Sequence, residues 1–142
     1  MHLFPRENYL KKIRGFYHDD GMIKVITGVH RCGKSCPMQC IAEELRAEGV
    51  DDDRIVFFDL NRYGYRSVKA PEQLEALIGP LLAVSGTKYL FIDEVQNVVG
   101  FEDVLNGFRT EGGFSIFITE SNSYLLSGEL ATKLTGRYIE YR

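Results

Sequence analysis

The stretch Gly28–Ser35, with the sequence GVHRCGKS, limits what this chain can fold into more than any other part of it. Two glycines enclose four residues, and a lysine and a serine follow the second glycine. The apolar run at 22–27 predicts a buried strand directly before this stretch, and apolar side chains at helical spacing predict a helix over 34–48. Glycine-rich turns of this spacing between a strand and a helix are typical of phosphate-binding loops. The pattern therefore predicts an α/β protein with a phosphate site.

Each part of this loop has a chemical reason to contact a phosphorylated ligand. Glycine lets the backbone wrap its amide hydrogens around a phosphate, where a side chain would obstruct the contact. The amino terminus of the following helix adds partial positive charge. We expect Lys34 to contact the β- and γ-phosphates and the Ser35 hydroxyl to coordinate Mg²⁺. The residues predicted to bind the phosphates are Gly28, Val29, His30, Arg31, Cys32, Gly33, Lys34, Ser35 and Cys36.

A second motif, YLFIDE at 89–94, is an apolar run that ends in two adjacent carboxylates. Acidic side chains at the end of a buried strand are costly unless a cation meets them. The Mg²⁺ of a bound triphosphate is such a cation. Asp93 is therefore predicted to hold the metal through water, and Glu94 to orient or deprotonate an attacking water. The alternative is a solvated strand end with no metal.

Strand and helix patterns alternate along the chain. Predicted strands lie at 22–27, 54–61, 88–93, 114–120 and 138–142, and predicted helices at 6–18, 34–48, 71–84, 101–110 and 123–134. Gly79-Pro80 is a candidate break within the third of these helices. Helices that separate strands in this way imply crossover connections. The predicted fold is an α/β P-loop NTPase with a doubly wound, largely parallel five-stranded sheet and helices on both faces.

Length and charge limit the function classes. With 142 residues the chain has the size of one domain, which we divide into an N-terminal linker helix at 1–21 and a P-loop domain at 22–142. The net charge of -3 argues against a broad surface for nucleic acid, although it is compatible with a local basic patch. No apolar run is long enough to cross a bilayer and no signal peptide is evident, which predicts a cytoplasmic protein. Cys32, Cys36 and Cys40 are expected to be reduced thiols rather than metal ligands.

Four segments resemble the predicted ATPases of the AAA+ superfamily: PRENYLKKI, GVHRCGKS, YLFIDEVQNV and ITESNSYLLSGELATKLTGRYIEYR. The resemblance covers essentially the whole chain. In that family the ATPase domain usually precedes a carboxyl-terminal region that is often described as nuclease-like and whose function is unsettled. The resemblance implies ATP and Mg²⁺ as ligands and no membrane. It also allows a homo-oligomer, and a nucleic-acid or protein client handled through the carboxyl-terminal region.

The resemblance also implies roles for two residues beyond the loop and the acidic motif. Asn122 falls where AAA+ proteins place sensor 1, a polar side chain near the γ-phosphate or the attacking water, and Ser121 competes for that role. The alternative for both is a helix cap ahead of the segment 123–134. Arg137 resembles the arginine that AAA+ proteins offer to the γ-phosphate, commonly of a neighbouring subunit, and the alternative is a surface arginine.

The chain departs from the family pattern in three ways. His30 stands where the family usually has arginine, which removes a charge near the phosphates. Glu120 stands where the family usually has glycine, which adds a carboxylate beside the sensor. The sequence stops at Arg142, before the helical lid and the carboxyl-terminal region of the family, so a fragment or a truncated protein is expected.

These observations lead to one main function and two alternatives. The main one is an ATPase domain that binds MgATP and hydrolyses it with Glu94 activating water; the catalytic set would be Glu94, Lys34, Asn122 and Arg137, and the metal set Ser35 and Asp93. The first alternative is an interaction module that binds ATP as a switch with little turnover, for which Glu120 and the missing lid are the grounds. A small-molecule kinase is the second alternative, although no arginine-rich lid segment is evident.

Three more features lie close to the predicted strand ends. Asp59 and Asn61, at the end of the second predicted strand, are candidates to assist water or Mg²⁺. Gln96 is expected either near the γ-phosphate or hydrogen-bonded within its own loop. The run Tyr63–Arg66 mixes aromatic and basic residues, a combination that stacks on single-stranded nucleic acid in other proteins.

Overall fold

The computed structural model describes residues 14–27, 37–120 and 138–141. Its helices and strands follow the order β1 (Ile23–Thr27), α2 (Pro37–Ala47), β2 (Ile55–Asp59), α3 (Pro71–Ile78), β3 (Lys88–Asp93), α4 (Phe101–Glu111), β4 (Phe114–Glu120) and β5 (Tyr138–Tyr141). Short 3₁₀ turns lie at Arg14–Phe16, Asp52–Arg54, Tyr63–Tyr65, Gly79–Ala83 and Val95–Asn97. The predicted alternation of strand and helix is confirmed within these ranges. The predicted helix at 123–134 lies outside them.

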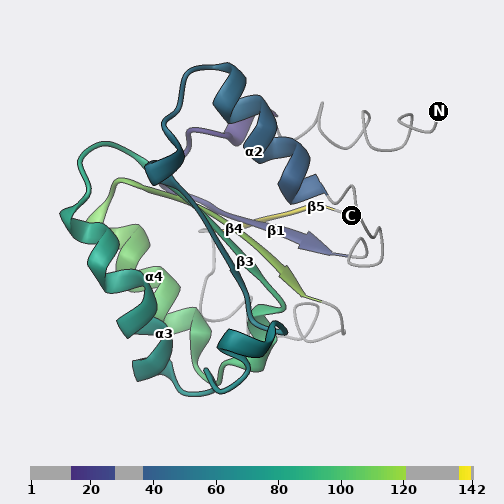
Figure 1. Ribbon diagram of the computed structural model, residues 1–142, viewed down its shortest axis with the longest axis vertical. Helices are drawn as coiled ribbons and strands as arrows, with labels where there is room; N and C mark the ends of the chain where they lie inside the picture. Colours follow the sequence, from purple (N-terminus) through teal and green to yellow (C-terminus); the bar gives the residue numbers. More distant parts are fainter. Residues whose placement is uncertain (1–13, 28–36, 121–137, 142) are drawn as a thin grey trace.

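The described strands form one sheet in the order β2-β3-β4-β1-β5, and every neighbouring pair is parallel. Helix α2 lies on one side of this sheet, and α3 and α4 lie on the other (Figure 1). The α/β class, the parallel sheet and the two helical layers are therefore as predicted. Because the strands are parallel, their carboxyl ends meet at one edge, which is where ligands bind in sheets of this kind.

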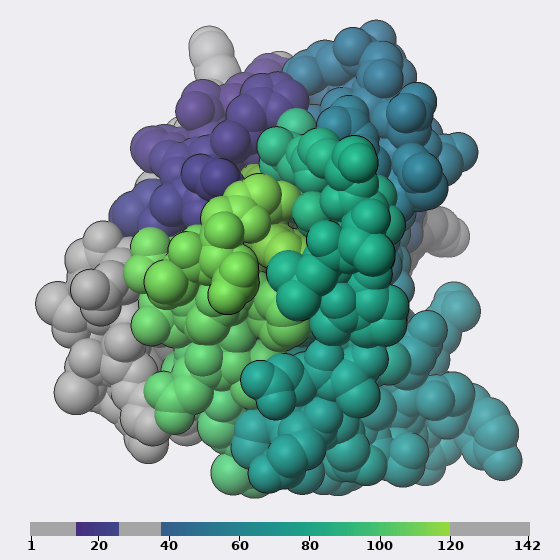
Figure 2. Space-filling model, turned by 90° about the vertical axis from the view of Figure 1, so that its left-hand side faces the viewer, coloured from purple at the N-terminus to yellow at the C-terminus, as the bar shows by residue number. Residues whose placement is uncertain are grey.

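The alternation of side chains along β3 shows how the two layers form. Leu90 and Ile92 are fully buried in a cluster with residues of α3 and α4, whereas Tyr89 and Phe91 are buried in a second cluster with α2. This is the period of two expected for a strand covered on both faces. Figure 2 shows the outer side of the α3 and α4 layer, in teal and green. Among the described residues, no helix has the length and apolar character needed to cross a lipid bilayer.

Two element boundaries differ from the prediction for local reasons. Strand β2 ends at Asp59 rather than at 61, because the Asp59 carboxylate accepts a hydrogen bond from the backbone N–H of Asn61 (3.0 Å) and turns the chain. Helix α3 ends at Ile78, and Gly79–Ala83 continues as a 3₁₀ turn. The predicted break at Gly79-Pro80 is confirmed, since proline has no N–H to donate within a helix.

The segment before β1 is not the α-helix that the spacing of apolar residues predicted over 6–18. In its described part, Arg14–Phe16 forms a single 3₁₀ turn. Arg14 donates two hydrogen bonds to the Glu44 carboxylate on α2 (2.9 and 2.7 Å), and the Tyr17 hydroxyl donates a third (2.8 Å). The chain thus docks on α2 instead of continuing as a helix, and the prediction is wrong for 14–18. Residues 1–13 lie outside the described part.

Lys24 is the least expected member of the core, because it lies on β1, an inner strand of the sheet, with its side chain fully buried. Its ammonium donates to the carbonyl oxygen of Asp19 and to Ser115 Oγ (2.9 Å), and it sits 4.8 Å from the centre of the Phe117 ring. Burial lowers the pKa of Lys24 from 10.5 to about 8, and the negative charges of Asp19 and Asp20 partly oppose that shift. The charged form therefore destabilises the fold.

We predict that stability rises with pH because of Lys24. Between pH 8 and 10 the unfolded chain keeps a proton on this amine that the folded chain has lost, so the free energy of unfolding should increase by about 2 kcal/mol. Above pH 10 the raised pKa values of the buried Tyr17 and Tyr89 act in the opposite direction. Urea unfolding at pH 8 and 10 measures the increase. It should disappear in Lys24→Met and persist in Lys69→Met, which changes an exposed lysine; an unchanged increase in Lys24→Met would contradict the assignment.

Candidate functional site

The carboxyl ends of β2 and β3 bring two of the predicted acidic residues together. Asp59 and Asp93 are the last residues of these strands, and they pair in the parallel register. The backbone continues this contact, because Leu60 N–H donates to the Asp93 carbonyl oxygen (3.1 Å). Glu94 follows directly and is buried, with 7% of its surface exposed. Three carboxylates therefore gather at the sheet edge where a parallel α/β fold binds its ligand.

Thr119 on β4 connects the two acidic residues of the β3 motif. Its hydroxyl accepts a hydrogen bond from the Glu94 backbone N–H (3.0 Å) and donates one to Asp93 Oδ1. The side chain is 4% exposed, so both bonds are shielded from solvent. Thr119 thus fixes the Asp93 carboxylate and the Glu94 backbone at the same time. The sequence analysis missed this residue; its only signal was a polar side chain one position before the end of an apolar strand.

Glu94 has a strained backbone. Its φ of 60° and ψ of 48° lie in the left-handed region, and within the described residues it is the only non-glycine residue with a positive φ. A side-chain-bearing residue in this conformation costs on the order of 1 kcal/mol and persists where the surroundings impose it. The hydrogen bond to Thr119 imposes it on the backbone. The Glu94 side chain is also held, because its Oε1 accepts a hydrogen bond from Gln96 Nε2 (2.7 Å). Gln96 is thus hydrogen-bonded within its own loop, which is one of the two roles predicted for it from the sequence.

The electrostatics of the site favour a cation. Burial raises the pKa of Asp93, and the neighbouring negative charges of Asp59 and Glu94 raise it further, against the lowering effect of its hydrogen bonds to Thr119 and the Glu94 N–H. The negative charge of Asp59 is only weakly compensated by Arg62, since Arg62 Nε lies 3.9 Å from the Asp59 carboxylate and both side chains are exposed. Among the described side chains, no three of the His, Cys, Asp and Glu residues are arranged so that they could hold a metal ion together. Their hard oxygen donors suit Mg²⁺, which commonly uses one or two carboxylates together with phosphate and water.

The remaining predicted site residues lie outside the described part of the structure. They are Gly28, Val29, His30, Arg31, Cys32, Gly33, Lys34, Ser35, Cys36, Asn122 and Arg137. The described strands end beside one another at this edge of the sheet. Thr27 and Glu120, the last residues of β1 and β4, are register partners. The carboxyl ends of β1 and β4 therefore lie at the sheet edge that carries Asp93.

We predict that the Thr119 hydroxyl sets the ionisation of Asp93. In Thr119→Val, which keeps the shape of the side chain, Asp93 loses the donor that lowers its pKa, so that pKa should rise further. The buried Glu94 N–H also loses its acceptor, which should reduce the free energy of unfolding by about 1–3 kcal/mol. Titration of the Asp93 carboxyl by NMR and urea unfolding measure the two effects. Thr119→Ser retains a hydroxyl and should restore both; equal behaviour of the valine and serine variants would contradict this role.

Comparison with known proteins identifies the family. The family described as AAA domain matches residues 20–142 of the sequence. This range includes the glycine-rich loop and strand β3, which ends at Asp93 and is followed by Glu94. The chain belongs to the AAA domain family. The resemblance to AAA+ ATPases drawn from the sequence motifs is thereby confirmed.

Relatives of this AAA domain are longer proteins. A Haemophilus influenzae protein described as uncharacterized is 38% identical over 141 residues, which are 99% of this chain and 35% of the relative. A second uncharacterized protein, from Methanocaldococcus jannaschii, is 34% identical over 123 residues, covering 83% of this chain and 25% of the relative. The chain thus spans about a third or less of the relatives it matches. Among solved structures, Saccharomyces cerevisiae RIF2 aligns with a TM-score of 0.65 at 16% identity, over 99% of this chain and 55% of that one, which indicates a shared fold.

Proposed function

We propose that this AAA domain binds MgATP and hydrolyses it, with Glu94 activating the attacking water. The observation that carries the proposal is the arrangement of Asp93, Glu94 and Thr119 at the carboxyl edge of the sheet. Strand β4 alone separates β3 from β1, and the GVHRCGKS loop begins directly after β1. An acidic pair with Glu94 buried and Asp93 half-buried, next in the sheet to the strand that precedes a phosphate-binding sequence, is the combination that MgATP hydrolysis requires.

In this proposal each residue has a separate task. Backbone amides of the loop and Lys34 bind the phosphates, while Ser35 and Asp93 hold Mg²⁺, Asp93 through water. The metal, when bound, neutralises charge that develops on the transferred phosphoryl group. Glu94 accepts a proton from water, and its left-handed backbone and the bond from Gln96 restrict where its carboxylate lies. Thr119 positions both acidic residues without contacting substrate.

Two further roles in the proposal come from the family resemblance. Asn122 acts as the polar sensor of the γ-phosphate. Arg137 reaches the γ-phosphate of a neighbouring copy, which makes a homo-oligomer the fully active form. An arginine supplied in this way can increase the rate by ~10³ or more, so dilute chain should hydrolyse ATP slowly.

A second candidate function is a nucleotide switch with little turnover. The observation that favours it is the 2.7 Å hydrogen bond from Gln96 to Glu94 Oε1, because a carboxylate engaged in this way is less available as a base. A carboxylate at Glu120, the last residue of β4, would also oppose a triphosphate. For either function, the family resemblance allows a nucleic-acid or protein client to be handled through regions that the longer relatives have beyond the aligned part.

Phosphate release from MgATP at several chain concentrations tests the proposal. Hydrolysis that requires Mg²⁺ and rises faster than linearly with concentration is expected for an ATPase completed by a neighbouring copy. Tight nucleotide binding with no phosphate release at any concentration would favour the switch. Absence of both binding and release would overturn the two candidates together.

A further inference from the structure

The chain between β2 and α3 is locally basic and carries two tyrosines. Residues 60–71, LNRYGYRSVKAP, contain three basic residues and no acidic residue, in a chain whose net charge is -3. Two tyrosines lie between the first two basic residues. Three positive charges thus lie close in sequence to an aromatic pair, and a local basic patch of this kind is compatible with the net negative charge of the chain.

The fold gives the two tyrosines different environments. Tyr65 packs edge-on against Phe58, with ring centres 5.6 Å apart, and joins the core on the α3 and α4 side. Tyr63 is 89% exposed, which makes it the most exposed large hydrophobic side chain among the described residues. The Arg66 guanidinium lies 6.0 Å from the centre of the Tyr63 ring. Tyr65 therefore anchors the segment, and Tyr63 presents an aromatic face to solvent with a cation beside it.

The segment is held in a defined conformation by its own backbone. Arg62 N–H donates to the Asp59 carbonyl, Tyr65 N–H to that of Arg62 (2.9 Å), and Val68 N–H to that of Tyr65. The side chain of Val68 is buried, with 8% exposed. A surface fixed in this way loses little conformational entropy when a ligand binds.

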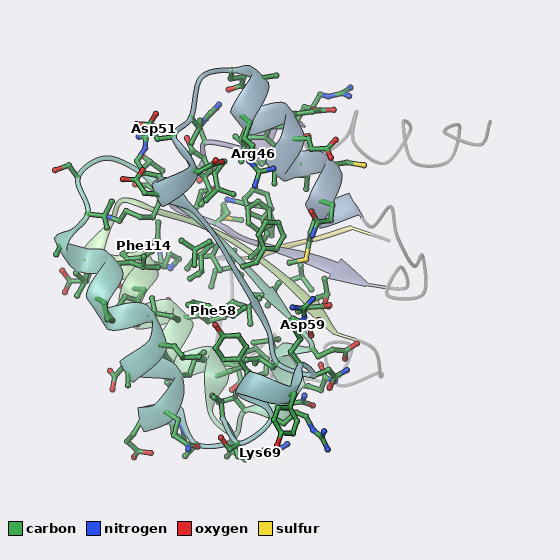
Figure 3. The ribbon with its side chains drawn as sticks, viewed as in Figure 1. Arg46, Asp51, Phe58, Asp59, Lys69 and Phe114 are labelled. Atoms are coloured by element: carbon green, nitrogen blue, oxygen red, sulfur yellow. The ribbon has the colours of Figure 1, made fainter. Side chains whose placement is uncertain are left out.

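The loop after β2 meets a second loop at Lys69. Val99 is 74% exposed, and its N–H donates to the carbonyl of Lys69 (2.9 Å). In Figure 3, Lys69 lies at the bottom of the molecule, with Asp59 above it and Arg46 and Asp51 at the top, and in Figure 2 the teal segment 60–71 stands out at the lower right. We give the name Tyr63 surface to the exposed residues of these two loops: Arg62, Tyr63, Arg66, Lys69 and Val99.

We propose that the Tyr63 surface binds single-stranded nucleic acid, with a base stacked on Tyr63 and phosphates paired with Arg62, Arg66 and Lys69. Every base offers a flat face to an aromatic ring, and cations spaced beside that ring match the charges of a flexible phosphate backbone. Duplex nucleic acid fits less well, because its bases are already stacked on each other. The ion pair of Arg62 with Asp59 is long and exposed, so it leaves the arginine available to phosphate.

The Tyr63 surface is also joined to the candidate ATP site. Leu60 N–H donates to the Asp93 carbonyl oxygen, and Asn97 Nδ2 donates to Asn61 Oδ1 (3.0 Å). Residues 60 and 61, which precede the Tyr63 surface in the chain, are therefore hydrogen-bonded to the segment that carries Asp93 and Glu94. A strand on this surface would lie beside the nucleotide. The binding itself, however, requires neither ATP nor hydrolysis.

Fluorescence anisotropy with a labelled oligothymidylate of ~20 nucleotides tests the proposal, since this length exceeds the site of a typical single-strand-binding fold. Tyr63→Ala should weaken binding roughly tenfold through the loss of stacking. The double change Arg62→Gln and Arg66→Gln should reduce the slope of log affinity against log salt by about 1.4, as two phosphate contacts are lost. Leu82→Ala, which truncates an exposed apolar side chain elsewhere, and Arg46→Gln, at the opposite end, are matched controls and should bind like the parent chain. Circular dichroism verifies that each variant is folded.

Several results would overturn the proposal. No binding of oligothymidylate or oligouridylate at low salt would do so, as would equal binding by Tyr63→Ala and the parent chain. Equal affinity for a duplex of the same length would exclude stacking. Competition by polyglutamate that matches competition by unlabelled oligothymidylate would instead assign the Tyr63 surface to an acidic polypeptide. Because the measurement contains no nucleotide, it can succeed whether or not the chain hydrolyses ATP.

Discussion

Replacing Glu94 by glutamine is expected to reduce ATP turnover by about 10²–10⁴-fold while leaving nucleotide affinity within a small factor of the parent value. The amide has nearly the shape of the carboxylate and can still accept the hydrogen bond from Gln96, so the buried loop should remain in place. It cannot accept a proton from water. The measurement is phosphate release under single-turnover conditions, together with nucleotide affinity by equilibrium titration.

Glu72→Gln is the matched control for this variant. Glu72 lies in the first turn of α3 with its side chain exposed, so the same chemical change there should leave turnover unaltered. Equal turnover by Glu94→Gln and the parent chain would remove Glu94 from the proposed chemistry. A loss of affinity as large as the loss of turnover would show that Glu94 supports binding rather than catalysis.

The Asp93→Asn variant should be more stable than the parent chain and worse at using Mg²⁺. Burial and the charges of Asp59 and Glu94 raise the pKa of Asp93. The folded chain therefore loses stability as the pH rises through that pKa and the carboxyl ionises. Asparagine is neutral and can still accept the hydrogen bond from Thr119, so the free energy of unfolding at pH 7 should increase. This advantage should vanish below about pH 3, where the parent carboxyl is protonated in both the folded and the unfolded chain. Urea unfolding across this pH range measures it.

The metal defect of Asp93→Asn is measured separately. The ratio of the ATP affinity with Mg²⁺ to the ATP affinity without it should fall roughly tenfold in this variant. The reason is that the side chain that holds the metal through water loses its negative charge. Asp53→Asn changes an exposed carboxylate in the 3₁₀ turn before β2 and should alter neither the ratio nor the pH dependence. A variant that is less stable than the parent at pH 7, with an unchanged Mg²⁺ effect, would refute the assignment of Asp93 as the metal residue.

Much of the fold could be predicted because its local signals agree with one another. β3 and β4 begin and end where the apolar runs at 88–93 and 114–120 begin and end. Both strands are buried on two faces, so uninterrupted apolar sequence and turn residues at each end are sufficient signals. The acidic pair at 93 and 94 was predictable for the opposite reason, since charge at the end of such a run conflicts with burial and calls for a ligand.

The residues that could not be predicted depend on contacts between distant segments. Lys24 is buried because Asp19 and Ser115 supply oxygen acceptors for its ammonium, and Ser115 lies 91 residues after Lys24 in the sequence. Thr119 matters through its bonds to Asp93 and Glu94, which a single sequence does not connect. The left-handed backbone of Glu94 is likewise imposed by β4. The failed helix prediction at 14–18 has the same origin, because Glu44 on α2 captures Arg14 and Tyr17.

Calorimetric titration of the chain with a slowly hydrolysed ATP analogue, with and without Mg²⁺, tests the central claim most directly. The account predicts saturable binding of one analogue per chain that strengthens with Mg²⁺, loses this strengthening in Asp93→Asn, and is lost in Lys34→Ala. Absence of binding heat under all conditions would contradict it. So would Mg²⁺-dependent binding by Lys34→Ala and by Asp93→Asn that is as strong as binding by the parent chain.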